Sequence, residues 1–341
     1  MHRTRSTQTP MRRFRYGQVM ALAASSAALL GAVSSPARAQ ITILADFGNS
    51  ITSDPNHVAI ENTLNSAVAA FEANISTPIT VRMAFGEMNT GLGQSSTFFG
   101  NVSYSSFLTQ LNSVSSSAND ATALSVLNPE GSAVNPVNGN TNINVKTANL
   151  RAVGFNAPAP TGQSFDGLSG GQWDGVIQLN TSLTTPGSSG SSNQYSLEAV
   201  AEHEMDEVLG LGSALPNLPF STIFPQDLYR YDNTGVRNFT TSGDNAWFSI
   251  NGTTDLVQFN QTGGGADYGD WHSSGTVRVQ DAFGTVGSSP TLGPAELTAL
   301  DVIGYNLTPA AAGTPEPGSL ALFAGMGLSG AVFALRRRAR K

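Results

Sequence analysis

Two apolar segments, one near each end of the 341-residue chain, bound the part that can fold as a domain in water. The first runs from Val19 to Val33, after five arginines and before the small-residue triplet Ala37-Arg38-Ala39. This order of segments predicts a secretory signal peptide over residues 1–39, since a buried helix does not usually carry five arginines ahead of its apolar run. We therefore expect cleavage by signal peptidase and an exported domain that begins near Gln40.

The second apolar segment, Leu320 to Leu335, is 16 residues long and is followed by the basic cluster Arg336 to Lys341. It predicts a short transmembrane helix whose basic end stays in the cytoplasm. Together with the preceding Pro315-Glu316-Pro317, residues 313–341 resemble a PEP-CTERM sorting tail of Gram-negative bacteria. The resemblance implies a transient inner-membrane anchor, cleavage by an exosortase, and release or attachment at the cell surface. A plain C-terminal anchor fits the same hydropathy pattern.

Charge is distributed unevenly between the ends and the centre. The two end segments carry 11 of the 17 Lys and Arg residues but one of the 24 Asp and Glu residues, so residues 40–312 carry 6 basic and 23 acidic side chains and a net charge near −17. Such an acidic surface repels phosphate backbones and suits divalent cations, so we expect no nucleic-acid partner. Cysteine is absent, which excludes disulfide bonds and thiolate ligands.

Residues 40–312 are expected to form an α+β domain with a mixed twisted sheet, a few helices and a C-terminal part rich in loops and short strands. Runs of apolar and β-branched residues predict strands at Ile41–Asp46, Ile79–Phe85 and Trp173–Asn180. Apolar residues at helical spacing predict a helix that starts behind Asp54-Pro55 and reaches Phe71, and others at Ser105–Leu111, Ser196–Leu209 and Ala295–Ile303.

The predicted helix Ser196–Leu209 contains the sequence His203-Glu204-Met205-Asp206-Glu207. Residues four apart lie one turn apart on the same helix face, so His203 and Glu207 can bind one ion together, and both are competent zinc ligands. This His-Glu-x-x-Glu core resembles the zincin signature His-Glu-x-x-His. The resemblance implies that Glu204 is the catalytic carboxylate that takes a proton from the attacking water.

A helical projection separates the residues of this helix into two sides. The apolar residues that define the expected buried side are Val200, Ala201, Val208 and Leu211. The acidic residues of the opposite, expected solvated side are Glu198, Glu202 and Asp206. Glu204 falls within the apolar arc, where a carboxylate has to be paired, protonated or linked to a metal.

The longer metzincin pattern agrees with this chain at one further position and differs at two. Gly210 stands seven residues after His203, where metzincins end this helix at a glycine. Ser213 takes the place of the third histidine, and no methionine between Met205 and Met326 can form a Met-turn. The resemblance to exported bacterial metalloproteases implies a zincin-like fold around a central metal-binding helix, zinc as the ion, and peptide-bond hydrolysis as the activity.

The third metal ligand has several candidates. His272, in a polar segment flanked by glycine, is the leading candidate, and its alternative role is that of a surface turn residue. Asp270 in the same segment competes with it, and Asp227 and Asp232 are weaker candidates. His57, in the first turn of its helix, is expected to have a capping or surface role. Calcium is a second candidate ion, although no Asp-x-Asp-x-Asp-Gly loop is present.

Two hypotheses for function follow from these patterns. In the first, the protein is a secreted or surface zinc endopeptidase in which His203, Glu207 and His272 hold the metal and Glu204 is the general base. In the second, it is a non-catalytic matrix or surface-binding protein on a degenerate zincin scaffold. Convergence of the ligands in an open cleft would favour the enzyme, whereas an arginine bound to Glu207 would favour the scaffold.

Overall fold

The computed structural model describes residues 40–309 and 311, except for residues 130, 188, 219, 264 and 265. The predicted signal peptide and the predicted sorting tail with its transmembrane helix lie outside these residues. Within the described ranges, no helix has both the length and the apolar character that crossing a bilayer requires.

A four-stranded mixed sheet with the order β1-β2-β8-β3 organises the first part of the described domain. β1 (Thr42–Phe47), β2 (Thr80–Glu87) and β8 (Gly175–Leu179) run parallel, and β3 (Gly93–Thr97) lies antiparallel to β8 at the edge. The prediction of an α+β domain with a mixed sheet is confirmed.

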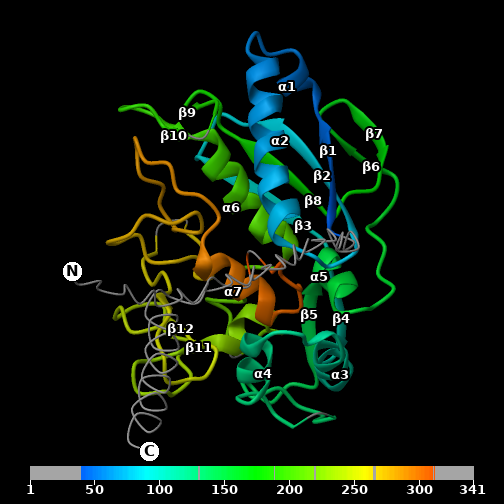
Figure 1. The fold of residues 1–341 in the computed structure, drawn as a ribbon, viewed down its shortest axis with the longest axis vertical. Helices are drawn as coiled ribbons and strands as arrows, with labels where there is room; N and C mark the ends of the chain where they lie inside the picture. The colour runs from blue at the N-terminus through cyan, green and yellow to red at the C-terminus, as the bar shows by residue number, and fades with distance from the viewer. Residues whose placement is uncertain are drawn as a thin grey trace, which may run out of the picture. The chain divides into compact units, whose positions relative to one another are not determined.

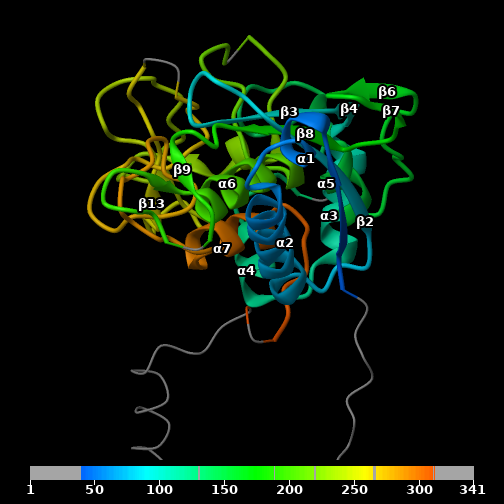
Figure 2. The ribbon, with the colours of Figure 1, turned by 90° about the horizontal axis from the view of Figure 1, so that it is seen from above.

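Two helices lie side by side on one face of this sheet, as Figures 1 and 2 show: α2 (His57–Asn74) and α6 (Leu197–Leu209). α2 contacts β1, and α6 contacts β8 and β3. The buried apolar side chains of α2 are those of the predicted helical pattern: Ile60, Leu64, Ala67, Val68 and Phe71. The sheet and α2 therefore hold α6 along its length.

Shorter elements complete the first part of the domain. They are α1 (Asn49–Thr52), β4 (Phe99–Ser103), α3 (Tyr104–Val114), α4 (Ala118–Leu124), β5 (Asn142–Lys146), α5 (Thr147–Ala152), β6 (Gln163–Phe165), β7 (Leu168–Gly171), β9 (Thr184–Thr185) and β10 (Tyr195–Ser196). β4 pairs with β5, and β6 with β7, in antiparallel ribbons, whereas β9 and β10 pair in parallel.

Beyond α6 the chain forms loops and short strands, as predicted. The regular elements there are the 3-10 helix η1 (Pro225–Tyr229), β11 (Arg230–Tyr231), β12 (Trp247–Phe248), β13 (Val257–Gln258) and α7 (Pro294–Val302). The buried rings of Phe248, Phe259 and Trp271 pack together, with centroids 5.2 Å apart for Phe259 and Trp271. This aromatic cluster anchors Trp271. The preceding residue, Asp270, faces α6.

Candidate metal centre

Helix α6 has well-defined ends. The Ser196 side chain accepts a hydrogen bond from the backbone N–H of Ala199 (3.2 Å) and so caps the first turn. At the other end Gly210 has φ +153°, and a Cβ atom there would lie 2.7 Å from Cδ1 of Ile303. The buried Lys146 ammonium donates to the carbonyls of Glu207 (2.6 Å) and Leu211 (2.5 Å), which places a cation at the negative end of the helix.

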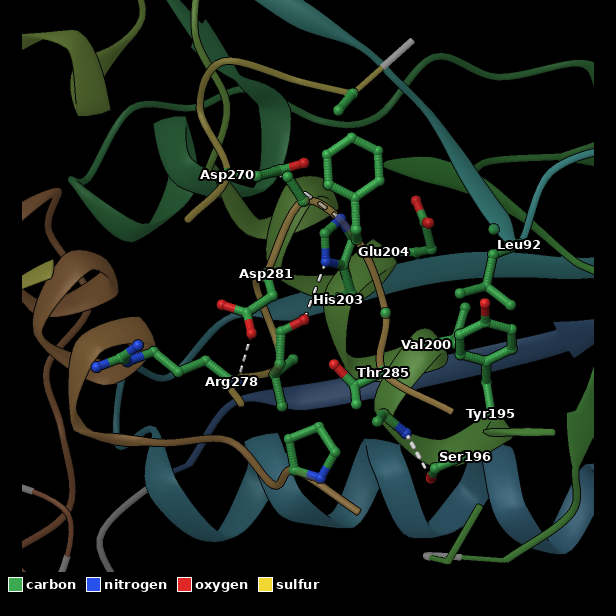
Figure 3. A pocket seen from close by; sticks show the side chains of 18 of the residues that line it. Leu92, Tyr195, Ser196, Val200, His203, Glu204, Asp270, Arg278, Asp281 and Thr285 are labelled. Atoms are coloured by element: carbon green, nitrogen blue, oxygen red, sulfur yellow. Dashed lines mark hydrogen bonds and ion pairs between the residues drawn. The ribbon is translucent and has the colours of Figure 1, made fainter. Parts of the chain in front are cut away.

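Three side chains converge at the middle of this helix. His203 and Glu207 from α6 and Asp270 from the segment before Trp271 each offer a ligand atom, and these atoms all lie within 4.8 Å of one another. His203 Nε2 lies 3.9 Å from Glu207 Oε1 and 3.8 Å from Asp270 Oδ1. Figure 3 shows His203 between Asp270 and Glu204. This group can hold a metal ion.

Neighbouring hydrogen bonds orient each of the three donors. Nδ1 of His203 lies 3.0 Å from the carbonyl oxygen of Val279, an acceptor, so Nδ1 is the donor of this hydrogen bond and Nε2 is the ring atom that faces the group. The Ser95 hydroxyl, on β3, donates a short hydrogen bond to Glu207 Oε2. No arginine contacts the Glu207 carboxylate among the contacts of the described residues.

The electrostatics of the group fit a cation. Burial lowers the pKa of the His203 imidazole, but the carboxylates of Asp270, Glu204 and Glu207 outweigh this effect and raise the pKa to about 10. Burial raises the pKa of Asp270 to about 8, although the positive charge of His203 acts to lower it. Burial also lowers the pKa of Lys146, the nearest ammonium group. The carboxylates of Glu204, Glu207 and Asp270 therefore repel one another, and a divalent cation would relieve this repulsion.

Glu204 lies beneath the edge strand β3. Only 5% of its surface is exposed, and a Cβ atom on Gly93 would lie 2.4 Å from Glu204 Oε1. Burial and the charge of Glu207 raise the pKa of Glu204 to about 8. The predicted burial of this carboxylate within the apolar arc is confirmed.

The group opens on a cavity of about 480 Å³. Its walls include residues 91–95 at and before the start of β3, the first turns of α6, and the segment from Val277 to Thr285. Leu92, Tyr195 and Val200 form an apolar wall beside Glu204 in Figure 3. A molecule in this cavity would contact both the metal-binding donors and an apolar surface.

His272, the leading sequence candidate, is not part of the group. Its Nδ1 atom lies 2.8 Å from the hydroxyl of Ser274, in the arrangement of a surface turn, while Asp270 takes the third position. The physical reason is the burial of Trp271, which is fully enclosed and whose Nε1–H donates to Glu296. Trp271 anchors the chain so that Asp270 points to α6 and His272 lies beyond it.

The weaker ligand candidates have structural roles. The buried Asp227 carboxylate accepts hydrogen bonds from Ser213 and from the backbone N–H of Ala214 and of Phe224. Asp232 closes an exposed turn through the N–H and hydroxyl of Thr234. Nδ1 of His57 lies 3.3 Å from Glu61 on the next turn of α2, which agrees with a surface role.

The expectation of a solvated acidic side on α6 was wrong. Glu202 and Asp206 are buried, because α7 and the residues before it cover this side of the helix. Glu202 accepts a hydrogen bond from the backbone N–H of Leu292 (3.0 Å). Burial raises the pKa of Asp206, and the nearby charge of Glu296 on α7 raises it further. A helical projection cannot detect this cover, since it comes from residues far along the chain.

Sequence reasoning also missed the residues that support the ligands. Ser95 lies in a serine- and glycine-rich stretch that carries no catalytic pattern. Lys146 had a usable signal, because it is the single lysine between residues 40 and 312. Gln280, whose Nε2 atom donates to Asp270 Oδ1 (3.0 Å), had none.

No protein-family model, curated protein or solved structure matches this chain. Membership of the zincin or metzincin families therefore stays a prediction, and inferences about function depend on the geometry of the site itself.

Proposed function

We propose that the protein is a zinc-dependent endopeptidase that acts outside the cytoplasm. The observation that carries the proposal is the convergence of His203, Glu207 and Asp270 at one wall of a cavity, with the buried carboxylate of Glu204 next to them. It supports the hydrolase over the non-catalytic scaffold, because Glu207 remains available to a metal.

The donor set favours zinc over calcium. Imidazole nitrogen and carboxylate oxygen are both zinc ligands, and three protein ligands leave a further position open, as in catalytic zinc sites. Calcium takes six to eight oxygen ligands, and an imidazole nitrogen is a poor member of such a set. The zincin-like fold is part of the same proposal, and a helix that carries two ligands behind an antiparallel edge strand supports it.

A zinc ion bound here would polarise a substrate carbonyl and make a water molecule nucleophilic at neutral pH. His203, Glu207 and Asp270 would hold the ion, and the Val279 carbonyl keeps His203 in the tautomer that binding requires. Glu204 would accept a proton from that water in its ionised form and pass it to the leaving amine; burial and the charge of Glu207 raise its pKa, which makes the carboxylate a stronger base than an exposed glutamate.

The cavity supports a peptide substrate. Strand β3 lies at the sheet edge and lines the cavity, so its backbone can pair with an extended chain. The apolar wall of Leu92, Tyr195 and Val200 would keep water away from the proton acceptor when a substrate fills the cavity.

We place this activity at the cell surface or in the medium on the strength of the predicted signal peptide and sorting tail. Signal peptidase and an exosortase are the processing partners, and a transient inner-membrane anchor precedes release or attachment. Exported protein cut near Gln40 is the expected product, and retention of residues 1–39 in that product would contradict this placement.

The test combines metal analysis with a matched pair of variants on α6. We expect purified protein to contain about one equivalent of zinc, and Glu204→Gln to keep the zinc while casein hydrolysis falls by a factor of about 10² or more. Glu198→Gln makes the same chemical change on a half-buried residue outside the metal-binding group, and activity should stay at the wild-type level. Protein that neither contains zinc nor cleaves casein would favour the non-catalytic alternative, and full activity in Glu204→Gln would exclude Glu204 as the proton acceptor.

A further inference from the structure

Gln280 is the side chain that reaches two of the three metal donors without belonging to the set. Its Nε2 atom lies 3.0 Å from Asp270 Oδ1 and 3.5 Å from His203 Nε2. The residue is fully buried, and its backbone is held on both sides: its N–H donates to Glu296 and its carbonyl accepts from Trp271. These backbone hydrogen bonds and the burial of the side chain therefore hold the amide group next to the two donors.

The other end of the amide has no partner. Oε1 of Gln280 is buried and accepts no hydrogen bond, an unfavourable state for an amide oxygen. Meanwhile Nε2 of Gln280 faces Nε2 of His203 and Oδ1 of Asp270, the two atoms that a metal ion would bind. Once an ion binds His203 Nε2, the N–H of Gln280 that faces this atom has no acceptor there, and the hydrogen bond to Asp270 Oδ1 shares its acceptor with the ion.

The spacing matches that of a metal ligand. In tetrahedral zinc sites with bonds of about 2.0–2.1 Å, neighbouring donor atoms lie about 3.3 Å apart. Nε2 of Gln280 lies 3.0 Å from Asp270 Oδ1 and 3.5 Å from His203 Nε2, and these two distances bracket the expected value. Rotation of the amide by 180° would put the oxygen atom where the nitrogen now lies.

We propose that Gln280 is a fourth protein ligand, which binds the ion through Oε1 after this rotation and closes the coordination sphere when no substrate is present. The inference rests on the metal site of the proposed function and adds a latent state to it. Substrate has to displace Gln280 before hydrolysis begins, so the residue restrains activity while it strengthens metal binding.

Zinc affinity of the full chain, measured by competition with a chromogenic chelator, tests the proposal in three variants. We expect Gln280→Ala to weaken zinc binding about tenfold. Gln280→Glu keeps an oxygen donor but cannot donate a hydrogen bond, so it should bind zinc at least as tightly as wild type. Gln261→Ala truncates a buried glutamine that hydrogen-bonds to Thr240, away from the metal, and should leave the affinity unchanged.

The isosteric variant separates a ligand from a residue that only orients Asp270. If Gln280 merely donates to Asp270, Gln280→Glu loses that donor, adds a like charge and binds zinc more weakly than wild type. That result, or unchanged affinity in Gln280→Ala, would overturn the inference. Gln280→Glu also decides the matter if Gln280→Ala fails to fold.

Cobalt substitution gives a second measurement that does not depend on hydrolysis. We expect azide to change the visible spectrum of the cobalt form of Gln280→Ala and not that of the wild type, because only the variant has an open position. Equal azide binding by both proteins would overturn the inference. If wild type binds zinc and cleaves casein but Gln280→Glu binds zinc weakly, the fourth-ligand inference fails and the proposed activity stands. If zinc binding depends on Gln280 but wild type does not cleave casein, the proposed activity fails and the fourth-ligand inference stands.

Discussion

Gly93→Ala tests how closely the edge strand packs on the candidate proton acceptor. A Cβ atom at this position would lie 2.4 Å from Glu204 Oε1 and 2.9 Å from Val200 Cγ1, against about 3.5–4.0 Å for an ordinary contact. Either β3 moves away from α6 by about 1 Å or the Glu204 carboxylate turns aside. Overpacking of this kind costs about 1–3 kcal/mol of folding free energy. For a domain of this size that corresponds to a fall in Tm of about 2–12 °C.

The effect on catalysis should exceed the effect on stability. A displacement of about 1 Å at a reacting group can lower the rate about 10²-fold, so we expect casein hydrolysis to fall by a factor of 10–100 at a temperature where the variant is folded. Zinc content should stay near one equivalent, because the added methyl group points at Glu204 rather than at the three donors.

Gly263→Ala is the matched control for this substitution. Its Cβ atom would meet its nearest neighbour, the Tyr268 hydroxyl, at 3.8 Å, so Tm and activity should match the wild type. Wild-type Tm and wild-type hydrolysis in Gly93→Ala would refute the close packing of β3 on Glu204.

Two further predictions concern the metal and the pH dependence of stability. Removal of zinc by a chelator should lower the Tm of wild type but not that of His203→Ala, since that variant has lost the imidazole donor; equal shifts in both would place the bound zinc elsewhere. Burial, with help from the charge of Asp120, raises the pKa of Asp301 to about 6, so its contribution to stability is complete below its unfolded value near 3.9 and declines as pH rises through about 6. Asp301→Asn, in which an amide oxygen can still accept from Ser117, should therefore gain about 1–3 kcal/mol relative to wild type between pH 4 and pH 7 in urea unfolding; a constant difference across that range would contradict the assignment.

The elements that sequence patterns predicted are those whose signal is local. The helical repeat of apolar residues located α2 and α6, and Ser196 and Gly210 marked the ends of α6. The strands β2 and β8 are rich in apolar residues because each lies between two other strands and buries most of its side chains, whereas β1 lies at the sheet edge and is only partly buried. Their existence follows from composition over a few residues.

Strand β3 shows where local reasoning failed. Gly93–Thr97 consists of glycine, glutamine, serine and threonine, a composition that predicts a loop. It is a strand because its backbone pairs with β8 and because Gly93 is small enough to lie against α6. The hydrogen bond from Ser95 to Glu207 depends on this pairing, so no pattern near Ser95 could have revealed it.

The amino-acid sequence by itself determined that an imidazole and a carboxylate, His203 and Glu207, share one face of a helix, because helix geometry fixes the relation of residues four apart. Only the tertiary structure decided that Asp270 rather than His272 joins them, and that Glu202 and Asp206 are covered rather than solvated. These outcomes depend on the packing of α6 against segments more than 60 residues further along the chain, at Asp270 and at Leu292. The direction of a side chain in such a segment depends on the neighbours against which the segment packs, and those neighbours come from distant parts of the chain.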